Sequence, residues 1–162
     1  MAGHGLGKWV ERPLVNISPE LVPFWEGLQR HEFRLCRCTK CDTHYFPFTI
    51  CIHHADIPEF DEMVWSPSSG HGKVFAKVVV HQVRDPDYQA EVPYVLALVE
   101  LDEGPLFSTR IVDCLPSQVR IGSEVAVLFY DVPEAGHTLP VFALTAGSEE
   151  PGPESGHLTP VR

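Results

Sequence analysis

The sequence has few basic residues and no long apolar run. Its 12 Lys and Arg residues stand against 22 Asp and Glu residues, which gives a formal net charge of -10 at pH 7. Such an acidic chain repels polyanions unless its basic residues gather on one face, which disfavours a nucleic-acid binder. No run approaches the roughly 18 apolar residues of a membrane-spanning helix, and the N-terminus lacks a charged start followed by an apolar block. We therefore expect a soluble cytoplasmic protein whose partners are neither membranes nor nucleic acids.

The chain also lacks a disulfide framework and the common local motifs of catalysis. Its five cysteines are an odd number, and Cys36 and Cys114 have no obvious partners, which fits a reducing compartment. There is no nucleophile elbow with a Ser-His-Asp order, no glycine-rich phosphate loop, and no histidine with a carboxylate partner in a local motif. We predict no catalytic residue in this chain.

Four potential metal ligands form the most informative motif that is present. Cys38 and Cys41 are separated by two residues, and Cys51 and His54 repeat this spacing. Two tight knuckles of this kind can direct four ligands to one tetrahedral ion, as in a zinc ribbon. A Cys3His set leaves no position for an activating water, so the motif predicts structural zinc. His53 is the alternative fourth ligand, and we favour His54 because its spacing from Cys51 mirrors the first knuckle.

A short amphipathic helix is predicted before this motif. Ser18 is a suitable capping residue, Pro19 suits a first helical position, and four apolar residues follow at helical spacing: Leu21, Phe24, Trp25 and Leu28. Because a proline deep inside a helix clashes with the carbonyl four residues back, we expect the regular helix to begin near Pro23.

The helix and the neighbouring ribbon are predicted to form a partner interface. A small zinc ribbon offers little core to receive many large apolar groups, so some of them should face another protein. The residues assigned to this interface are Phe24, Trp25, Leu28, Phe46 and Phe48. The alternative is that the helix packs on its own domain.

Charged residues segregate around the ribbon. Four basic residues precede or enter the first knuckle, and four acidic residues follow the second: Arg30, Arg34, Arg37 and Lys40, then Asp56, Glu59, Asp61 and Glu62. We expect an internally neutralised surface. The alternative is an anion site that binds the phosphates of coenzyme A through Arg34, Arg37 and Lys40.

The second half of the chain predicts a small β-barrel. Five segments are rich in strand-forming residues, at 73–83, 94–101, 106–112, 124–131 and 138–144. Residues 102–104 make a tight hairpin, whereas a longer loop with Tyr88 near its centre separates the first two strands. Tyr88 and the preceding His81 could meet a substrate, although a loop tyrosine more often packs on its own barrel. Five strands in about 75 residues suit a Greek-key barrel of the OB type.

These patterns divide the chain into four parts. We predict an N-terminal arm at 1–17, a helix and zinc ribbon at 18–62, an OB-fold barrel at 63–145 and a disordered tail at 146–162. The expected fold class is mainly β, with one N-terminal helix and a zinc ribbon joined to a five-stranded barrel. The tail assignment depends on its Gly, Pro, Ser and Glu content.

Several short motifs recur in an order that resembles a known family. Each is weak alone, whereas the ordered set is specific. They are Pro23-Phe24-Trp25-Glu26, a strand into Cys38-x-x-Cys41, Phe46-Pro47, Gly72-Lys73-Val74-Phe75, the stretch at 93–104, Arg120-Ile121-Gly122 and Leu139-Pro140-Val141-Phe142. Over residues 18–144 the chain is similar to the acyl-CoA-associated family formerly called domain of unknown function 35.

The resemblance implies a rubredoxin-like zinc ribbon joined to an OB-fold, with His54 at the position of the family's usual fourth cysteine. It also implies an accessory subunit, because family members are encoded beside thiolase-fold proteins or fused to hydratase-like domains. The implied partner is a thiolase-like retro-aldolase that cleaves a β-hydroxyacyl-CoA, such as a steroid side-chain thioester, with acyl-CoA as a ligand of the hetero-oligomer. Accessory subunits of a thiolase or of a MaoC-type enoyl-CoA hydratase are the related alternatives. A zinc-ribbon and OB-fold nucleic-acid binder is the alternative of a different class.

Overall fold

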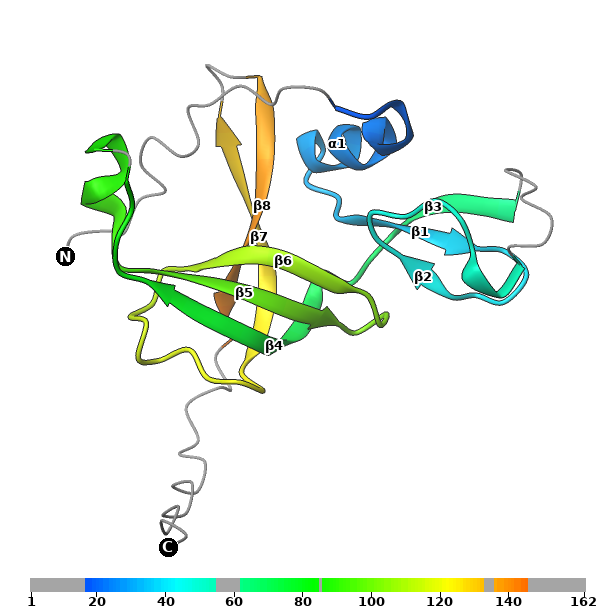
Figure 1. The fold of residues 1–162 in the computed structure, drawn as a ribbon. Coiled ribbons are helices and arrows are strands. Elements are labelled where there is room, and N and C mark those ends of the chain that lie inside the picture. Colours follow the sequence, from blue (N-terminus) through cyan, green and yellow to red (C-terminus); the bar gives the residue numbers. More distant parts are fainter. Residues whose placement is uncertain (1–16, 55–61, 85, 133–135, 146–162) are drawn as a thin grey trace, which may run out of the picture.

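The computed structural model describes residues 17–54, 62–84, 86–132 and 136–145. A helix, a three-stranded sheet and a closed five-stranded barrel make up this part of the chain, so the fold is mainly β as predicted (Figure 1). The helix and the small sheet lie at one end of the barrel. The predicted arm, except Ile17, and the predicted tail lie outside the described residues. None of the described helices is long and apolar enough to cross a membrane.

The predicted helix forms where its proline and its apolar spacing place it. A 3-10 turn, η2 (Pro19–Leu21), leads into α1 (Val22–Gln29), so the regular helix starts beside Pro23. Ser18 occupies the N-cap position of the 3-10 turn, without a side-chain capping hydrogen bond. The helix ends where His31 adopts a φ of 57°, which turns the chain towards the first strand.

The zinc ribbon is built on a small antiparallel sheet of order β2-β1-β3. Its strands are β1 (Arg34–Cys38), β2 (His44–Tyr45) and β3 (Met63–Pro67). The pairing of β3 with β1 corrects our boundary, because we assigned residues from 63 onward to the barrel. An alternating pattern predicts a strand but does not say which sheet it joins, since that is decided by the partner strand.

The barrel has five strands in the order β4-β5-β6-β8-β7, and β7 closes it by pairing with β4. The strands are β4 (His71–Val80), β5 (Tyr94–Leu101), β6 (Leu106–Val112), β7 (Glu124–Val132) and β8 (His137–Leu144). All neighbours are antiparallel except β6 and β8. This topology confirms the predicted OB-type barrel.

Two connections explain where the barrel strands end. Gly104 has a φ of 106° in the hairpin between β5 and β6, and its N–H donates to Leu101 O at 2.8 Å, as expected for a tight turn. The first barrel strand ends at Val80 rather than at residue 83. Its partner β5 begins at Tyr94, directly after Pro93, which has no N–H to donate to a ladder.

The long connection between β4 and β5 contains a 3-10 helix, η5 (Pro86–Glu91), which an ion pair fastens to the barrel. Arg110 on β6 donates from Nη1 to Glu91 Oε2 at 3.0 Å, and both side chains are almost fully buried. The Arg110 guanidinium also lies 4.0 Å from the centroid of the Tyr94 ring. Of the two loop residues suggested to meet substrate, His81 is exposed, and the side chain of Tyr88 lies outside the described residues.

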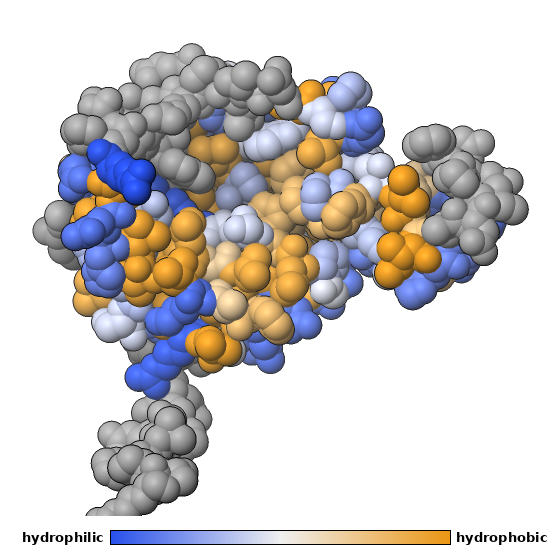
Figure 2. Space-filling view, in the orientation of Figure 1, coloured by the Kyte–Doolittle hydropathy of each residue, from blue (hydrophilic) through white to orange (hydrophobic). Residues whose placement is uncertain are grey.

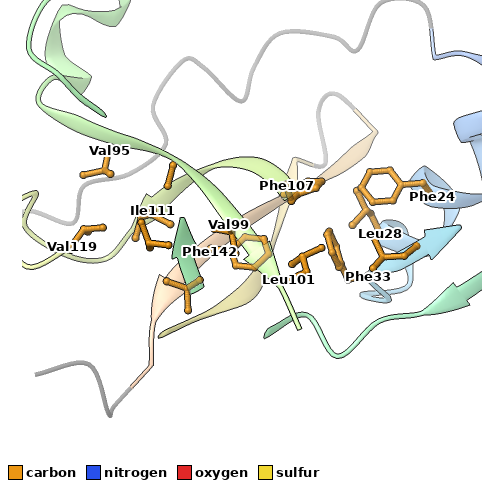
Figure 3. Packing of buried hydrophobic residues seen from close by; sticks show 14 residues of the cluster. Phe24, Leu28, Phe33, Val95, Val99, Leu101, Phe107, Ile111, Val119 and Phe142 are labelled. Atoms are coloured by element: carbon orange, nitrogen blue, oxygen red, sulfur yellow. The ribbon is translucent and has the colours of Figure 1, made fainter. Parts of the chain in front are cut away.

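One apolar core extends from the helix through the base of the ribbon into the barrel. Phe24 and Leu28 from α1 lie beside Phe33, and the aromatic cluster continues through Phe107 to Phe142 inside the barrel (Figure 3). The Phe107 ring centroid is 5.1 Å from that of Phe33 and 5.9 Å from that of Phe142. The helix and ribbon base therefore close one end of the barrel and are not an independent module.

A polar clamp holds the end of the helix on the barrel. His31 Nε2 lies 3.0 Å from a carboxylate oxygen of Asp131 on β7, and the His31 ring stacks on Phe129 with centroids 5.1 Å apart. The Thr138 hydroxyl donates to the same carboxylate at 2.7 Å. These two bonds lower the pKa of Asp131, the Thr138 bond more strongly, so the ionised carboxylate is favoured in the folded state.

We expect Asp131→Asn to lower the melting temperature at neutral pH. A carboxylate whose folded pKa is depressed contributes stability above its ordinary pKa of about 3.9, and this contribution disappears as pH falls through the folded pKa. The gap between wild type and variant should therefore be present at neutral pH and should narrow as pH falls below the ordinary carboxyl pKa of about 3.9. Thermal melting from about pH 2 to pH 7 measures this, with Asp102→Asn in the exposed hairpin as the control. A gap that stays constant over this range would contradict the clamp.

Candidate metal centre

The ribbon brings four side chains to one point. The ligand atoms of Cys38, Cys41, Cys51 and His54 all lie within 4.8 Å of one another. His54 Nδ1 is 3.2 Å from Cys51 Sγ and 3.6 Å from Cys38 Sγ, and the sulfurs of Cys41 and Cys51 are 3.6 Å apart. Donors placed 2.0 to 2.3 Å from a tetrahedral zinc ion are separated by about 3.3 to 3.8 Å. The geometry therefore fits a closed Cys3His zinc site.

Each pair of ligands is set by a tight local turn. Cys38 ends β1, and its carbonyl accepts a hydrogen bond from the N–H of Asp42, which adopts a φ of 61°. His54 ends the 3-10 turn η3 (Ile52–His54), and its N–H donates to Cys51 O at 3.2 Å. Both spacings of two residues thus become single turns, which point two donors inward. The structure brings His54, rather than the exposed His53, to the sulfurs.

The surroundings of the sulfurs favour a bound cation. The Thr43 hydroxyl lies 3.2 Å from Cys41 Sγ and, together with the Thr43 N–H, lowers the pKa of Cys41 to about 7. Burial raises the pKa of Cys38, and backbone N–H groups of Cys41 and Lys40 directed at its sulfur act in the opposite direction. Zinc binds thiolates, so a divalent ion would offset the cost of burying their charge.

Tyr45 supports the metal site through a contact that the sequence motifs did not predict. Its hydroxyl lies 3.3 Å from Cys51 Sγ in the buried interior of the ribbon. Burial and this contact raise the pKa of Tyr45 to about 12, so the phenol stays protonated and can donate to a thiolate. Its position between the two knuckles was the available signal, but many aromatic residues occupy such places only to fill a core.

The structure corrects part of the predicted partner interface. Phe24 and Leu28 are 2% and 0% exposed and belong to the shared core, because Phe33 and Phe107 receive them. The partly buried Trp25 and Phe46 also pack against core residues. The structure leaves Phe48 as the largely exposed member of the predicted set, at 68%.

The basic side chains near the first knuckle are already paired. Each forms an ion pair with a carboxylate of the described residues: Arg30 and Arg34 with Glu32, Arg37 with Asp42, and Lys40 with Glu62. Arg34 Nη2 lies 2.5 Å from Glu32 Oε2. The basic side chains are thus neutralised, which argues against the alternative anion site, but among the predicted acidic partners only Glu62 takes part within the described residues. Three of the predicted acidic residues, Asp56, Glu59 and Asp61, lie outside the described residues.

The fold and the metal centre together define a protein that combines a zinc ribbon with an OB-fold. Residues 25–51 match the family model described as "ChsH2, rubredoxin-like zinc ribbon domain", and residues 65–130 match "ChsH2, C-terminal OB-fold domain". The chain belongs to the DUF35 family. The ribbon match ends before His54, the position at which this chain departs from the four-cysteine pattern expected from the resemblance.

Relatives are similar over most of the described chain. A "DUF35 domain-containing scaffold protein" from Methanocaldococcus jannaschii is 42% identical over 62% of this chain and 69% of its own length. A "Probable enoyl-CoA hydratase alpha subunit" from Thermomonospora curvata is 31% identical over 86% of this chain, which spans only 42% of that protein. The solved structure "Ltp2-ChsH2(DUF35) aldolase" superimposes with a TM-score of 0.68 and 31% identity, covering 82% of this chain and 98% of the other.

Proposed function

We propose that this chain is the accessory subunit of a thiolase-fold acyl-CoA enzyme, most simply a retro-aldolase that cleaves a β-hydroxyacyl-CoA. The observation that carries this proposal is the similarity to the DUF35 chain of the Ltp2-ChsH2(DUF35) aldolase, which extends over 98% of that chain. A steroid side-chain thioester is the substrate suggested by the family resemblance. The acyl-CoA would be a ligand of the hetero-oligomer, with the thiolase-like partner performing the chemistry.

The metal centre supports a division of labour between the two subunits. Three cysteines and one histidine would fill the tetrahedral shell of a bound zinc ion, which would leave no open position for a substrate or a water molecule. Retro-aldol cleavage needs a base for the hydroxyl proton and a group that stabilises the thioester enolate. The His31 and Asp131 pair is engaged in the clamp between helix and barrel. We therefore assign the base and the enolate-stabilising groups to the partner.

Co-expression with a candidate thiolase-like partner tests the proposal. We expect a stable complex in size-exclusion chromatography, and cleavage of a β-hydroxyacyl-CoA into a ketone or aldehyde and a shorter acyl-CoA. The isolated chain should show no turnover above the uncatalysed rate, because the proposal assigns the catalytic groups to the partner. Cleavage by the purified single chain that a point substitution within it abolishes would overturn the assignment.

A hydratase complex is the second candidate, because the Thermomonospora relative carries a hydratase subunit name. A 3-oxo-4,17-pregnadiene-20-carboxyl-CoA hydratase alpha subunit from Mycobacterium tuberculosis is also 32% identical over 72% of this chain. The two candidates differ in their product. A hydratase adds water to an enoyl-CoA and keeps the carbon chain intact, whereas an aldolase shortens it, so mass analysis of the acyl-CoA product separates them.

The proposal leaves out nucleic-acid binding, which the charges of the barrel disfavour. Three of its five basic residues already have partners: Lys73 lies 3.8 Å from Glu124, Lys77 donates to backbone carbonyls, and Arg110 pairs with Glu91. Phosphate binding would have to displace these contacts. Single-strand binding by the isolated chain with a steep salt dependence would favour the nucleic-acid class instead.

A further inference from the structure

Three large apolar side chains are exposed on the segment that leads into the second zinc knuckle and on the first residue of its turn. Phe48, Ile50 and Ile52 are 68%, 48% and 72% exposed. Between them lie the half-buried Thr49 and the buried metal-centre residue Cys51. We call these three side chains the ribbon tip. Figure 2 shows hydrophobic side chains gathered on the surface of the projecting ribbon.

The ribbon tip does not serve the packing of the described chain. The small core of the ribbon consists of Cys38, Tyr45 and Cys51 with Met63 against it, and the shared core also omits the three tip residues. Exposed clusters of large apolar side chains favour association with other molecules. A surface loop without a binding role would therefore be expected to carry polar residues at these positions. The three tip side chains are thus apolar although the folding of the ribbon does not need them to be.

A second apolar surface, on the barrel, differs in its local packing. Val78 on β4 pairs directly with Leu96 on β5, and Ala76 pairs with Leu98. Cross-strand neighbours cover part of one another there, so that Leu96 and Leu98 are 37% and 38% exposed, whereas Val78 is 55% exposed. The tip residues have no ladder neighbours of this kind in the described sheets, so they gain more from being covered by another molecule.

We propose that the ribbon tip docks into a concave apolar groove of the thiolase-like partner subunit. The inference rests on the proposed function and adds to it the surface through which the subunits meet. A second copy of this chain is a poor occupant, because each copy has a net charge of -10 and the basic side chains near the first knuckle are already paired. The same charge opposes an anionic membrane surface. A projecting apolar segment fits a groove better than a flat surface.

The metal centre supplies the order that such a docking segment needs. The chain passes from Ile50 through Cys51 to Ile52, so Cys51 would hold both neighbours in place once it binds a metal ion. A segment ordered before binding loses less conformational entropy when it docks. The structural role of the ion would therefore extend from folding the ribbon to presenting its tip.

The test uses the full-length, zinc-loaded chain and the purified thiolase-like partner in a binding titration. We expect Ile52→Asp and the milder Phe48→Ser each to weaken the complex by about tenfold or more. Ile121→Asp is the matched control, because Ile121 is also 72% exposed but lies in a barrel turn. The affinity of Ile121→Asp for the partner should stay within about twofold of the wild-type affinity. A larger loss in the tip variants would then be specific to the tip. Val78→Asp tests whether the apolar surface of the barrel contributes to partner binding.

Zinc content and melting of each free variant show whether it is folded. A measurement on the wild-type complex needs no substitution: amide exchange of residues 48–52 should slow when the partner binds. A wild-type complex with unchanged exchange there, and with both tip variants binding normally, would overturn the tip proposal while leaving the accessory function intact.

Failure of the wild-type chains to associate would overturn both proposals together. Strong weakening by Val78→Asp with no effect of the tip variants would assign docking to the barrel surface instead. Two other outcomes would show that the tip binds something other than the partner subunit. They are tip-dependent self-association, and tip-dependent binding to vesicles of phosphatidylcholine and phosphatidylglycerol without partner binding.

Discussion

Replacing Phe24 by alanine is expected to destabilise the free chain by about 3 to 5 kcal/mol. Phe24 is 2% exposed and contacts rings from every part of the shared core. Its centroid lies 4.7 Å from that of Phe46, 5.8 Å from that of Phe33 and 6.3 Å from that of Phe107. Removing the ring leaves a cavity where helix, ribbon and barrel meet, so both lost burial and lost packing contribute.

Chemical denaturation of the free chain, without any partner, measures this effect. Phe48→Ala is the matched control, because it removes the same ring from a position that is 68% exposed and outside the core clusters. It should change the free energy of unfolding by less than about 0.5 kcal/mol. If Phe24→Ala changed the free energy of unfolding only slightly but abolished partner binding, Phe24 would belong to the partner interface, as the sequence first suggested.

Removing zinc is expected to loosen residues 38–54 while the barrel stays folded. The chain should bind about one zinc ion, and Cys51→Ser should weaken its affinity by more than about a hundredfold, since even changes in the second layer cost 10-fold to 100-fold. The knuckles depend on a core of only three buried residues, Cys38, Tyr45 and Cys51. Leu35 and Phe33, at the base of the ribbon, are instead held in the core shared with the barrel. Metal loss should therefore act on the outer half of the ribbon alone.

Metal analysis and amide exchange with and without a chelator measure this prediction. Cys36→Ala is the control, because Cys36 is buried beside the site but is not one of the four converging residues, and burial raises its pKa to about 11. That variant should keep its zinc. Undiminished exchange protection of residues 38–54 in metal-free protein would rule out a structural role for the ion.

The sequence could predict those features that depend on residues close together in the chain. The metal ligands come in two pairs spaced by two residues, and each pair becomes a single turn whatever surrounds it. The helix start follows from Pro19 and Pro23. The observed bounds of β5 and β6 are the predicted ones, because strong turn or breaker residues flank each strand.

What the sequence could not predict depends on contacts between distant residues. The strand at Met63–Pro67 alternates as a barrel strand would, but its partner is β1, and only the tertiary structure shows this. Phe24 and Leu28 were expected to face a partner because the ribbon alone could not bury them. Phe107 and Phe142 lie 83 and 118 residues after Phe24 in the sequence and provide the missing core.

The sequence by itself thus determined the metal centre, the helix and the OB-type barrel, since short-range spacing and periodicity encode them. The tertiary structure alone decided which apolar side chains remain available to a partner. It buries Phe24 and Leu28 and leaves Phe48, Ile50 and Ile52 exposed. The physical reason is that hydrophobicity shows a residue's tendency to leave water, whereas the packing of remote segments determines whether its own chain or another molecule covers it.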